Sequence, residues 1–184
     1  MTASVGAAQV PPGSEIERQL PSAYFHDSYQ ALLPARAAGN SALELSLQIF
    51  LKTPRWIDFL MRLRNRVVGL VGLKNLGSFN HLDPGKPAGA YRVGDRVGIF
   101  SLRYLTDMEV ILADSDKHLD VQVSVCKLLR DEAVLVNIST VVHVHNRLGK
   151  LYMFFVAPAH KVIAPATLRG LLRSGAGGSI VGSI

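Results

Sequence analysis

The sequence contains a single cysteine, Cys126, among 184 residues. One thiol excludes an internal disulfide and any zinc site built from several cysteines. No apolar run approaches the roughly 20 residues that a transmembrane helix needs. Residues 1–21 have neither the basic segment nor the apolar segment of a secretory signal. We therefore expect a soluble, cytoplasmic protein with no membrane span.

Charged residues are scarce, at 18% of the chain, whereas hydrophobic residues make up 48%. This balance favours a single compact domain over a disordered chain. The net charge is +6, but the basic residues are dispersed, apart from 62–66 and a thin group around Arg169 and Arg173. Because no basic patch is interleaved with aromatic residues, we expect no nucleic-acid partner.

The first third of the chain predicts a leader, a strand and two helices. Residues 1–20 are expected to form a flexible leader, since prolines and a glycine interrupt them. Residues 23–34 alternate as a first strand ending at a proline. Ser41, with Glu44 three residues later, predicts a capping box at the start of a helix. Pro54 suits the first turn of a second helix.

From Arg92 onward the apolar residues recur with a period of two, which indicates strands. The predicted strands are 97–105, 108–114, 118–129, 134–145 and 150–157. Short polar turns between them favour an antiparallel meander. One register places every apolar set opposite the next apolar set, and a slip of one residue would expose a whole aliphatic face.

An amphipathic helix within 157–175 is expected to close the domain, with Pro165 as a kink or a restart. Residues 175–184 read as a flexible, glycine-rich tail. The predicted domain therefore spans 21–174. An antiparallel sheet with one apolar face, and helices on that side, defines an α+β fold.

Several stretches resemble a bacterial family of domains of unknown function. They are DSYQALLP (27–34), TPRWIDFLMRLRNRVVGLVGLK (53–74), KHLDVQVSV (117–125) and HNRLGKLYMFFVAPAHKVIAPATLRGLL (145–172). That family is usually placed in the START-like and polyketide-cyclase helix-grip superfamily. Its members occur alone or fused behind NAD-dependent epimerase-like domains, which this chain does not contain. The resemblance implies a cavity between the sheet and the C-terminal helix, suited to an apolar or aromatic small molecule.

Large side chains on the predicted apolar faces are candidates for lining this cavity. They are Trp56, Phe59, Phe100, Tyr104, Met108, Met153 and Phe155. Tyr104 is the best polar candidate, because a buried hydroxyl needs a hydrogen-bonding partner. The alternative is that all of these are ordinary core residues.

Two anomalous residues complete the candidate site. His160, near the start of the closing helix, would gate the cavity or act as a general acid–base, unless it only caps backbone groups. Arg64 interrupts an apolar helix stripe and needs an anionic partner, either Asp27 or an anionic ligand. Tyr104, His160 and Arg64 would then carry any acid–base catalysis.

The pair His143 and His145 raises the question of a metal site. The predicted register places His118 beside His143, with Asp120 on the same side. Three ligands on one flat sheet face rarely converge on a metal ion, so we favour a solvated polar face and expect no metal.

The leading functional hypothesis is the binding of a hydrophobic or aromatic small molecule, without a cofactor. The alternatives are a cyclase, dehydratase or isomerase acting on a polyketide-like or terpenoid-like intermediate, and a protein-interaction module. There is no GxSxG motif and no phosphate-binding loop to support other chemistry. Whether the chain forms a homodimer is left open.

Overall fold

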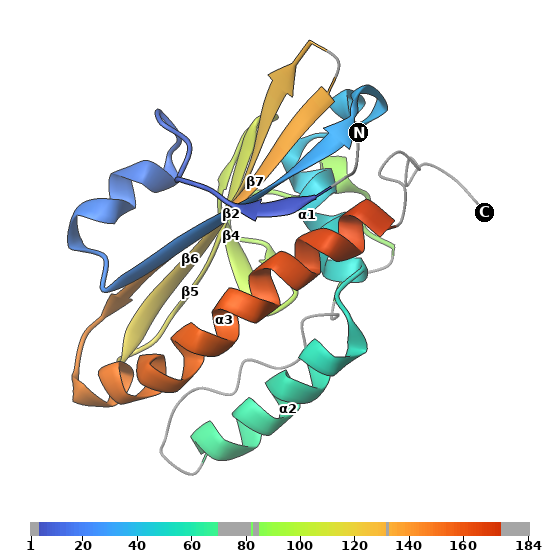
Figure 1. The fold of residues 1–184 in the computed structure, drawn as a ribbon. Helices are drawn as coiled ribbons and strands as arrows, with labels where there is room; N and C mark the ends of the chain where they lie inside the picture. Colours follow the sequence, from blue (N-terminus) through green and yellow to red (C-terminus); the bar gives the residue numbers. More distant parts are fainter. Residues whose placement is uncertain (1–3, 70–81, 83–84, 132, 174–184) are drawn as a thin grey trace.

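The computed structural model describes residues 4–69, 82, 85–131 and 133–173, with 63–69 described by their backbone alone. In chain order its elements are β1 (Val5–Ala7), η1 (Ile16–Ser22), β2 (Phe25–Pro34), η2 (Ala35–Gly39), α1 (Ala42–Leu51), α2 (Arg55–Gly69), η3 (Ala88–Ala90), β3 (Arg96–Val97), β4 (Phe100–Leu105), β5 (Glu109–Ser115), β6 (Leu119–Arg130), β7 (Ala133–Val144) and α3 (Arg147–Arg173). The strands form a seven-stranded antiparallel sheet in the order β1-β2-β7-β6-β5-β4-β3. The long helix α3 crosses one face of this sheet, with α1 and α2 beside it (Figure 1). The α+β fold is confirmed, and the arrangement is consistent with a helix grip.

The predicted alternation in the meander is confirmed for its central strands. Val121 pairs with Val142, and Val123 with Thr140, so these side chains share the face that α3 covers. The residues between them, such as Ser124 and Ser139, lie on the opposite face. The register of β6 and β7 is therefore the one that buries both aliphatic sets together.

The capping box at the start of α1 is also confirmed. The Ser41 hydroxyl accepts a hydrogen bond from the Glu44 backbone N–H at 3.2 Å, and the Glu44 carboxylate accepts one from the Ser41 N–H at 2.7 Å. These two bonds satisfy backbone donors that the first turn of a helix cannot pair internally.

The prediction of a strand over 150–157 is wrong, because these residues form the first part of α3. The Asn146 side-chain oxygen accepts a hydrogen bond from the Gly149 N–H at 3.1 Å, which caps the helix at its start. A short run that is apolar at nearly every position fits a buried helix as well as a strand. The helix also continues through Pro158 and through Pro165, where a kink or a restart was expected.

The first residues of the described chain differ from the expected flexible leader. β1 pairs with β2, and the backbone N–H groups of Glu15 and Ile16 donate to the Glu109 carboxylate at 2.7 and 3.2 Å. Ile16 is fully buried against Ile111 and Val141, on the sheet face opposite α3. Both faces of the central sheet are therefore covered by protein.

Two glycines bring α3 into direct contact with neighbouring backbone. A Cβ atom added at Gly149 would lie 2.4 Å from the His118 carbonyl oxygen, and one at Gly170 would lie 2.6 Å from the Lys52 carbonyl oxygen. Both distances are too short for any other residue unless the backbone moves. The two ends of α3 thus depend on glycine to approach the start of β6 and the end of α1.

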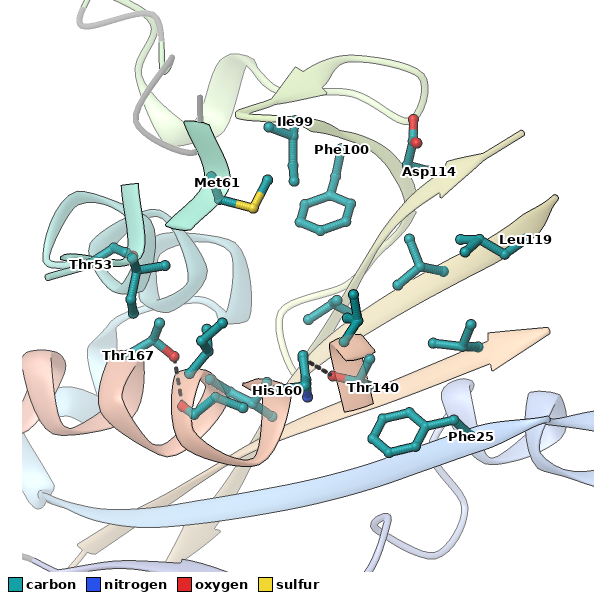
Figure 2. Close-up of a pocket in the computed structure, with 18 of the residues that line it drawn as sticks. Phe25, Thr53, Met61, Ile99, Phe100, Asp114, Leu119, Thr140, His160 and Thr167 are labelled. Atoms are coloured by element: carbon teal, nitrogen blue, oxygen red, sulfur yellow. Dashed lines mark hydrogen bonds between the residues drawn. The ribbon is translucent and has the colours of Figure 1, made fainter. Parts of the chain in front are cut away.

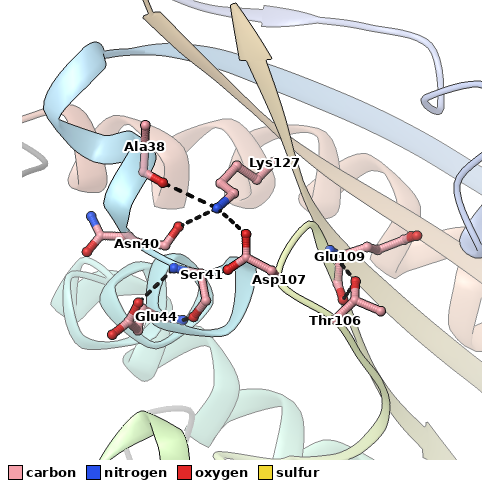
Figure 3. A network of polar contacts seen from close by, with 8 residues as sticks. All are labelled: Ala38, Asn40, Ser41, Glu44, Thr106, Asp107, Glu109 and Lys127. Atoms are coloured by element: carbon pink, nitrogen blue, oxygen red, sulfur yellow. Dashed lines mark hydrogen bonds and ion pairs between the residues drawn. The ribbon is translucent and has the colours of Figure 1, made fainter.

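A buried lysine joins the sheet to the segment that precedes α1 (Figure 3). The Lys127 ammonium group donates to the Asp107 carboxylate at 2.8 Å and to the Asn40 carbonyl at 2.9 Å, and lies 3.4 Å from the Ala38 carbonyl. A buried ammonium group is tolerated only with such partners. Lys127 therefore fixes η2, and with it the start of α1, over the end of β6.

One described helix, α3, is long and apolar enough to cross a membrane by length and composition alone. Its inner side, including Met153, Leu168 and Leu171, is instead buried in the domain. Length and composition alone therefore do not make α3 a membrane span, although the sequence analysis had expected no stretch of this kind.

Candidate functional site

An apolar cavity of about 200 Å³ lies between the sheet and the three helices (Figure 2). It is larger than the ~150 Å³ cavities that can hold a benzene molecule. The lining includes Phe25, Ile49, Phe50, Thr53, Ile57, Met61, Ile99, Phe100, Asp114, Asp116, Leu119, Val121, Val123, Val125, Ile138, Thr140, Val142, Tyr152, Met153, Val156, His160, Ile163, Ala164 and Thr167. Aliphatic and aromatic side chains dominate this surface, as they do in sites for small organic molecules.

The cavity exists because the sheet's aliphatic face is made of short side chains. Val121 pairs with Val142 and Val123 with Thr140 across β6 and β7, so short, branched side chains line the floor. On the opposite side, α3 contributes residues spaced three or four apart, including Met153, Val156 and His160. The pairing of β6 with β7 and the helical spacing of α3 thus place these side chains around the same cavity.

One polar group in this apolar wall is the His160 imidazole. Its Nδ1 atom lies 2.8 Å from Oδ2 of Asp27, and its Nε2 atom lies 3.5 Å from the Thr140 hydroxyl. Asp27 and Thr140 are direct partners across β2 and β7, so the sheet register places both under the helix residue. The Phe25 ring packs edge-on against the imidazole, with 6.0 Å between the ring centres.

This arrangement gives the imidazole a defined orientation. When Nδ1 carries the proton and donates it to Asp27, the lone pair of Nε2 is directed away from the carboxylate. The second Asp27 oxygen, Oδ1, is buried and finds no hydrogen-bond partner among the described residues. A histidine held by a carboxylate beside an apolar cavity can accept or donate a hydrogen bond, and can also transfer a proton.

Two carboxylates lie at the end of the cavity where β5 turns into β6. Asp114 is buried on the helix-facing side of β5. The Asp116 carboxylate accepts hydrogen bonds from the backbone N–H groups of His118 and Leu119, at 2.6 and 3.0 Å. Asp116 therefore stabilises the turn, and the cavity has a polar end as well as the polar group on its helix side.

Three of the residues predicted from the sequence line the cavity. Phe100 does so from β4, as expected, and His160 does so from α3. Met153 also lines it, but from the helix rather than from a strand.

Five predicted lining residues, Tyr104 and four others, are not among those that line the cavity. Trp56, Phe59 and Phe155 are 42%, 60% and 67% exposed, and Met108 lies in the turn before β5 at 37%. The residues of α2 that line the cavity are instead Ile57, one position after Trp56, and Met61, two positions after Phe59. Phe155 points outward because 150–157 is helical, so that period-two reasoning assigned it to the wrong side.

The prediction that Tyr104 faces the cavity is wrong. The pairing of β4 with β5 shifts between Leu102 and Tyr104, where a bulge inserts one extra residue. Leu102 therefore faces the cavity side, whereas Tyr104 packs with Ile111 on the opposite face. Beyond a bulge, each side chain lies on the opposite face from the one that simple alternation predicts, and no local sequence pattern predicts this bulge.

The Arg64 side chain lies outside the described residues. Asp27, considered above as its partner, bonds to His160.

The histidines on the other face form separate contacts rather than one cluster. The register pairs Asp120, not His118, with His143, so the expected adjacency is wrong. His143 bonds to the Gln19 carbonyl at 3.0 Å through Nε2, and His118 contacts Asn146 through Nδ1. Within the described part of the chain, no group of three ligating side chains could hold a metal ion.

Asp120 is the charged partner of His145, at 3.0 Å. Burial raises the pKa of the Asp120 carboxyl, but hydrogen bonds from Ser115 and His145 outweigh it and hold the pKa below its usual value. These contacts are those of a partly covered polar surface.

Sequence reasoning missed Thr140 as a site residue, and it considered Asp27 only as a partner of Arg64. The available signal was a polar residue at an inward position of an otherwise apolar strand face. Asp27 lies between Phe25 and Tyr29 on that face, and Thr140 lies between Ile138 and Val142. A buried polar residue needs a partner, and here each finds it on α3.

Comparison with known proteins adds the family but no activity. No curated protein and no solved structure matches the chain significantly. A family model described as "Protein of unknown function (DUF2867)" matches residues 19–167, which include β2 to β7, the cavity and His160. The chain belongs to the DUF2867 family.

Proposed function

We propose that this protein binds an apolar or aromatic small molecule that carries one hydrogen-bonding group. The observation that supports the proposal is the His160 imidazole, held by Asp27, on the helix side of a cavity lined mostly by apolar side chains. The apolar lining would supply most of the affinity, and His160 would orient the polar group. Membership of the START-like superfamily is part of this proposal, since its resemblance implies a cavity in this position.

The test compares two probes of equal shape, 1-naphthol and 1-methylnaphthalene, by titration calorimetry of the full chain. We expect 1-naphthol to bind more tightly, by about fivefold, since one hydrogen bond contributes about 1 kcal/mol. His160→Leu should remove this preference while leaving the binding of 1-methylnaphthalene largely unchanged.

A second variant tests the cavity independently of its polar group. Val121→Phe places a ring in the cavity and should abolish the binding of both probes, whereas Val93→Phe, at an exposed turn position, should not. Binding that survives Val121→Phe would place the ligand elsewhere and contradict the proposal.

A second candidate function is acid–base catalysis in the same cavity, as in a cofactor-independent isomerase, dehydratase or cyclase. The pairing of His160 with Asp27 favours it, because a carboxylate that accepts from one imidazole nitrogen fixes the tautomer and orients the other nitrogen to take a proton. A suitable probe is 5-nitrobenzisoxazole, whose ring opens in one step when a base removes the proton at carbon 3. Catalysis above the buffer rate that is lost in His160→Ala and reduced in Asp27→Asn would support an enzyme. Equal rates in all three proteins would count against it.

A further inference from the structure

The side of α3 that faces away from the sheet carries large apolar residues. Phe154 is 72% exposed and Phe155 is 67% exposed, and Leu151 and Val162 are more than half exposed. Their spacing of three, four and seven residues places them on one side of the helix, together with exposed Pro158. We call this stripe, from Leu151 to Val162, the outer face of α3. Apolar side chains gathered in this way usually mark a surface that meets another apolar phase.

Positive charge flanks the outer face without any compensation on the helix. The charged residues of α3 are Arg147, Lys150, Lys161, Arg169 and Arg173, all exposed, and there is no aspartate or glutamate between 147 and 173. The neighbouring helix α2 repeats the pattern. Trp56 and Phe59 are exposed next to exposed Arg55 and Arg62, and Asp58 is the acidic residue of α2.

We propose that the outer face of α3 docks on the surface of an anionic lipid bilayer, with the helix axis in the membrane plane. Aromatic and aliphatic side chains flanked by lysine and arginine are the composition of helices that lie at the interface between lipid head groups and acyl chains. The 27-residue helix would extend about 40 Å along that surface. Its inner side stays in the domain, so docking requires no unfolding.

Charge distinguishes this partner from a second copy of the chain. Two outer faces packed together would bring the cations of both helices into one interface with no acidic residue from either α3, which is costly. An anionic bilayer supplies the missing opposite charge over the whole length of the helix. The inference goes beyond the proposed ligand and does not depend on it, since it concerns the opposite side of α3.

The test is co-sedimentation of the full chain with phosphatidylcholine vesicles that contain or lack phosphatidylglycerol. We expect binding to the anionic vesicles alone, weakening as salt rises from about 0.1 M to about 1 M and the screening length falls from ~10 to ~3 Å. The variant Phe154→Glu with Phe155→Glu should lose binding. Lys150→Glu with Lys161→Glu should weaken it by about 25-fold or more, because each surface cation contributes about fivefold.

Matched controls change equally exposed residues elsewhere. Leu129→Glu, at the end of β6, and Arg36→Glu, on η2, should bind as the unaltered protein does. Circular dichroism of each variant would confirm that it is folded.

Equal binding to neutral and anionic vesicles, or unchanged binding of the phenylalanine variant, would overturn the proposal. So would light scattering that shows a dimer dissociated by the phenylalanine variant, together with no vesicle binding by the unaltered protein. If the unaltered protein bound neither naphthalene probe but still bound anionic vesicles, the proposed function would fail and this inference would stand by itself.

Discussion

Replacing Gly149 by alanine should destabilise the protein, although the same change usually stabilises a helix. In an exposed helix interior, alanine is favoured over glycine by about 1 kcal/mol. At Gly149, however, the new methyl group would lie 2.4 Å from the His118 carbonyl oxygen and 2.9 Å from a methyl carbon of Val144. Neither neighbour is the flexible end of a long side chain, so the first turn of α3 must move.

The size of the effect follows from these distances. Restoring an ordinary contact of 3.4 Å to the His118 oxygen requires a displacement of about 1 Å. Overpacking of this kind typically costs about 1–3 kcal/mol, which exceeds the gain in helix propensity. We expect a net loss of about 1–2 kcal/mol and a weakened bond between Asn146 and the Gly149 N–H.

The free energy of unfolding, from urea titration followed by circular dichroism, measures this effect. Gly39→Ala is the matched control, because an added Cβ there meets no atom within 4 Å. It should be neutral or slightly stabilising. If Gly149→Ala were as stable as the unaltered protein, the close seating of α3 on the start of β6 would be refuted.

Three further predictions concern the two faces of the sheet. Val123→Asp should cost at least about 3 kcal/mol, because it buries a charge in the apolar cavity, whereas Gln122→Asp should cost less than about 1 kcal/mol; equal losses would contradict the assigned facing. Ile16→Ala should cost about 2–4 kcal/mol by opening a void under η1, and an unchanged urea midpoint would show that the segment does not pack there. Asp120→Asn should lower stability at pH 7 by less than about 1 kcal/mol, since the carboxylate is partly exposed. The pKa of Asp120 is lowered in the folded state, so its stabilisation is present above the unfolded value of about 3.9 and disappears as pH falls through the folded value. A deficit that persists unchanged in strong acid would assign the loss to packing instead.

The sheet was predictable because many residues in each strand contribute to the same alternating pattern. Alternation along β6 and β7 extends over a dozen residues in each strand, and only one register buries both aliphatic sets. The capping box at Ser41 was predictable for the opposite reason, since both of its hydrogen bonds depend on residues three positions apart.

The errors arose where a single residue or a distant contact decides the structure. One extra residue in β4 reverses the side of Tyr104, and the stretch 150–157 is apolar enough to satisfy either period. The Asp27–His160 pair joins residues that are far apart in the chain, so no local pattern could have revealed it. The N-terminal segment is stabilised in the same way, by contacts with β5 and β7.

The location of Cys126 has a practical consequence. Its thiol is buried on β6 opposite Glu109, and desolvation, followed by the charge of Glu109, raises its pKa to about 11. At neutral pH only about one thiol in ten thousand is then ionised, so an alkylating reagent must wait for a local opening that exposes this face of the sheet. Because the chain has a single cysteine, the growth of one adduct peak in a mass spectrum would measure the rate of that opening directly. The unaltered protein can therefore report its own local opening, without any engineered label.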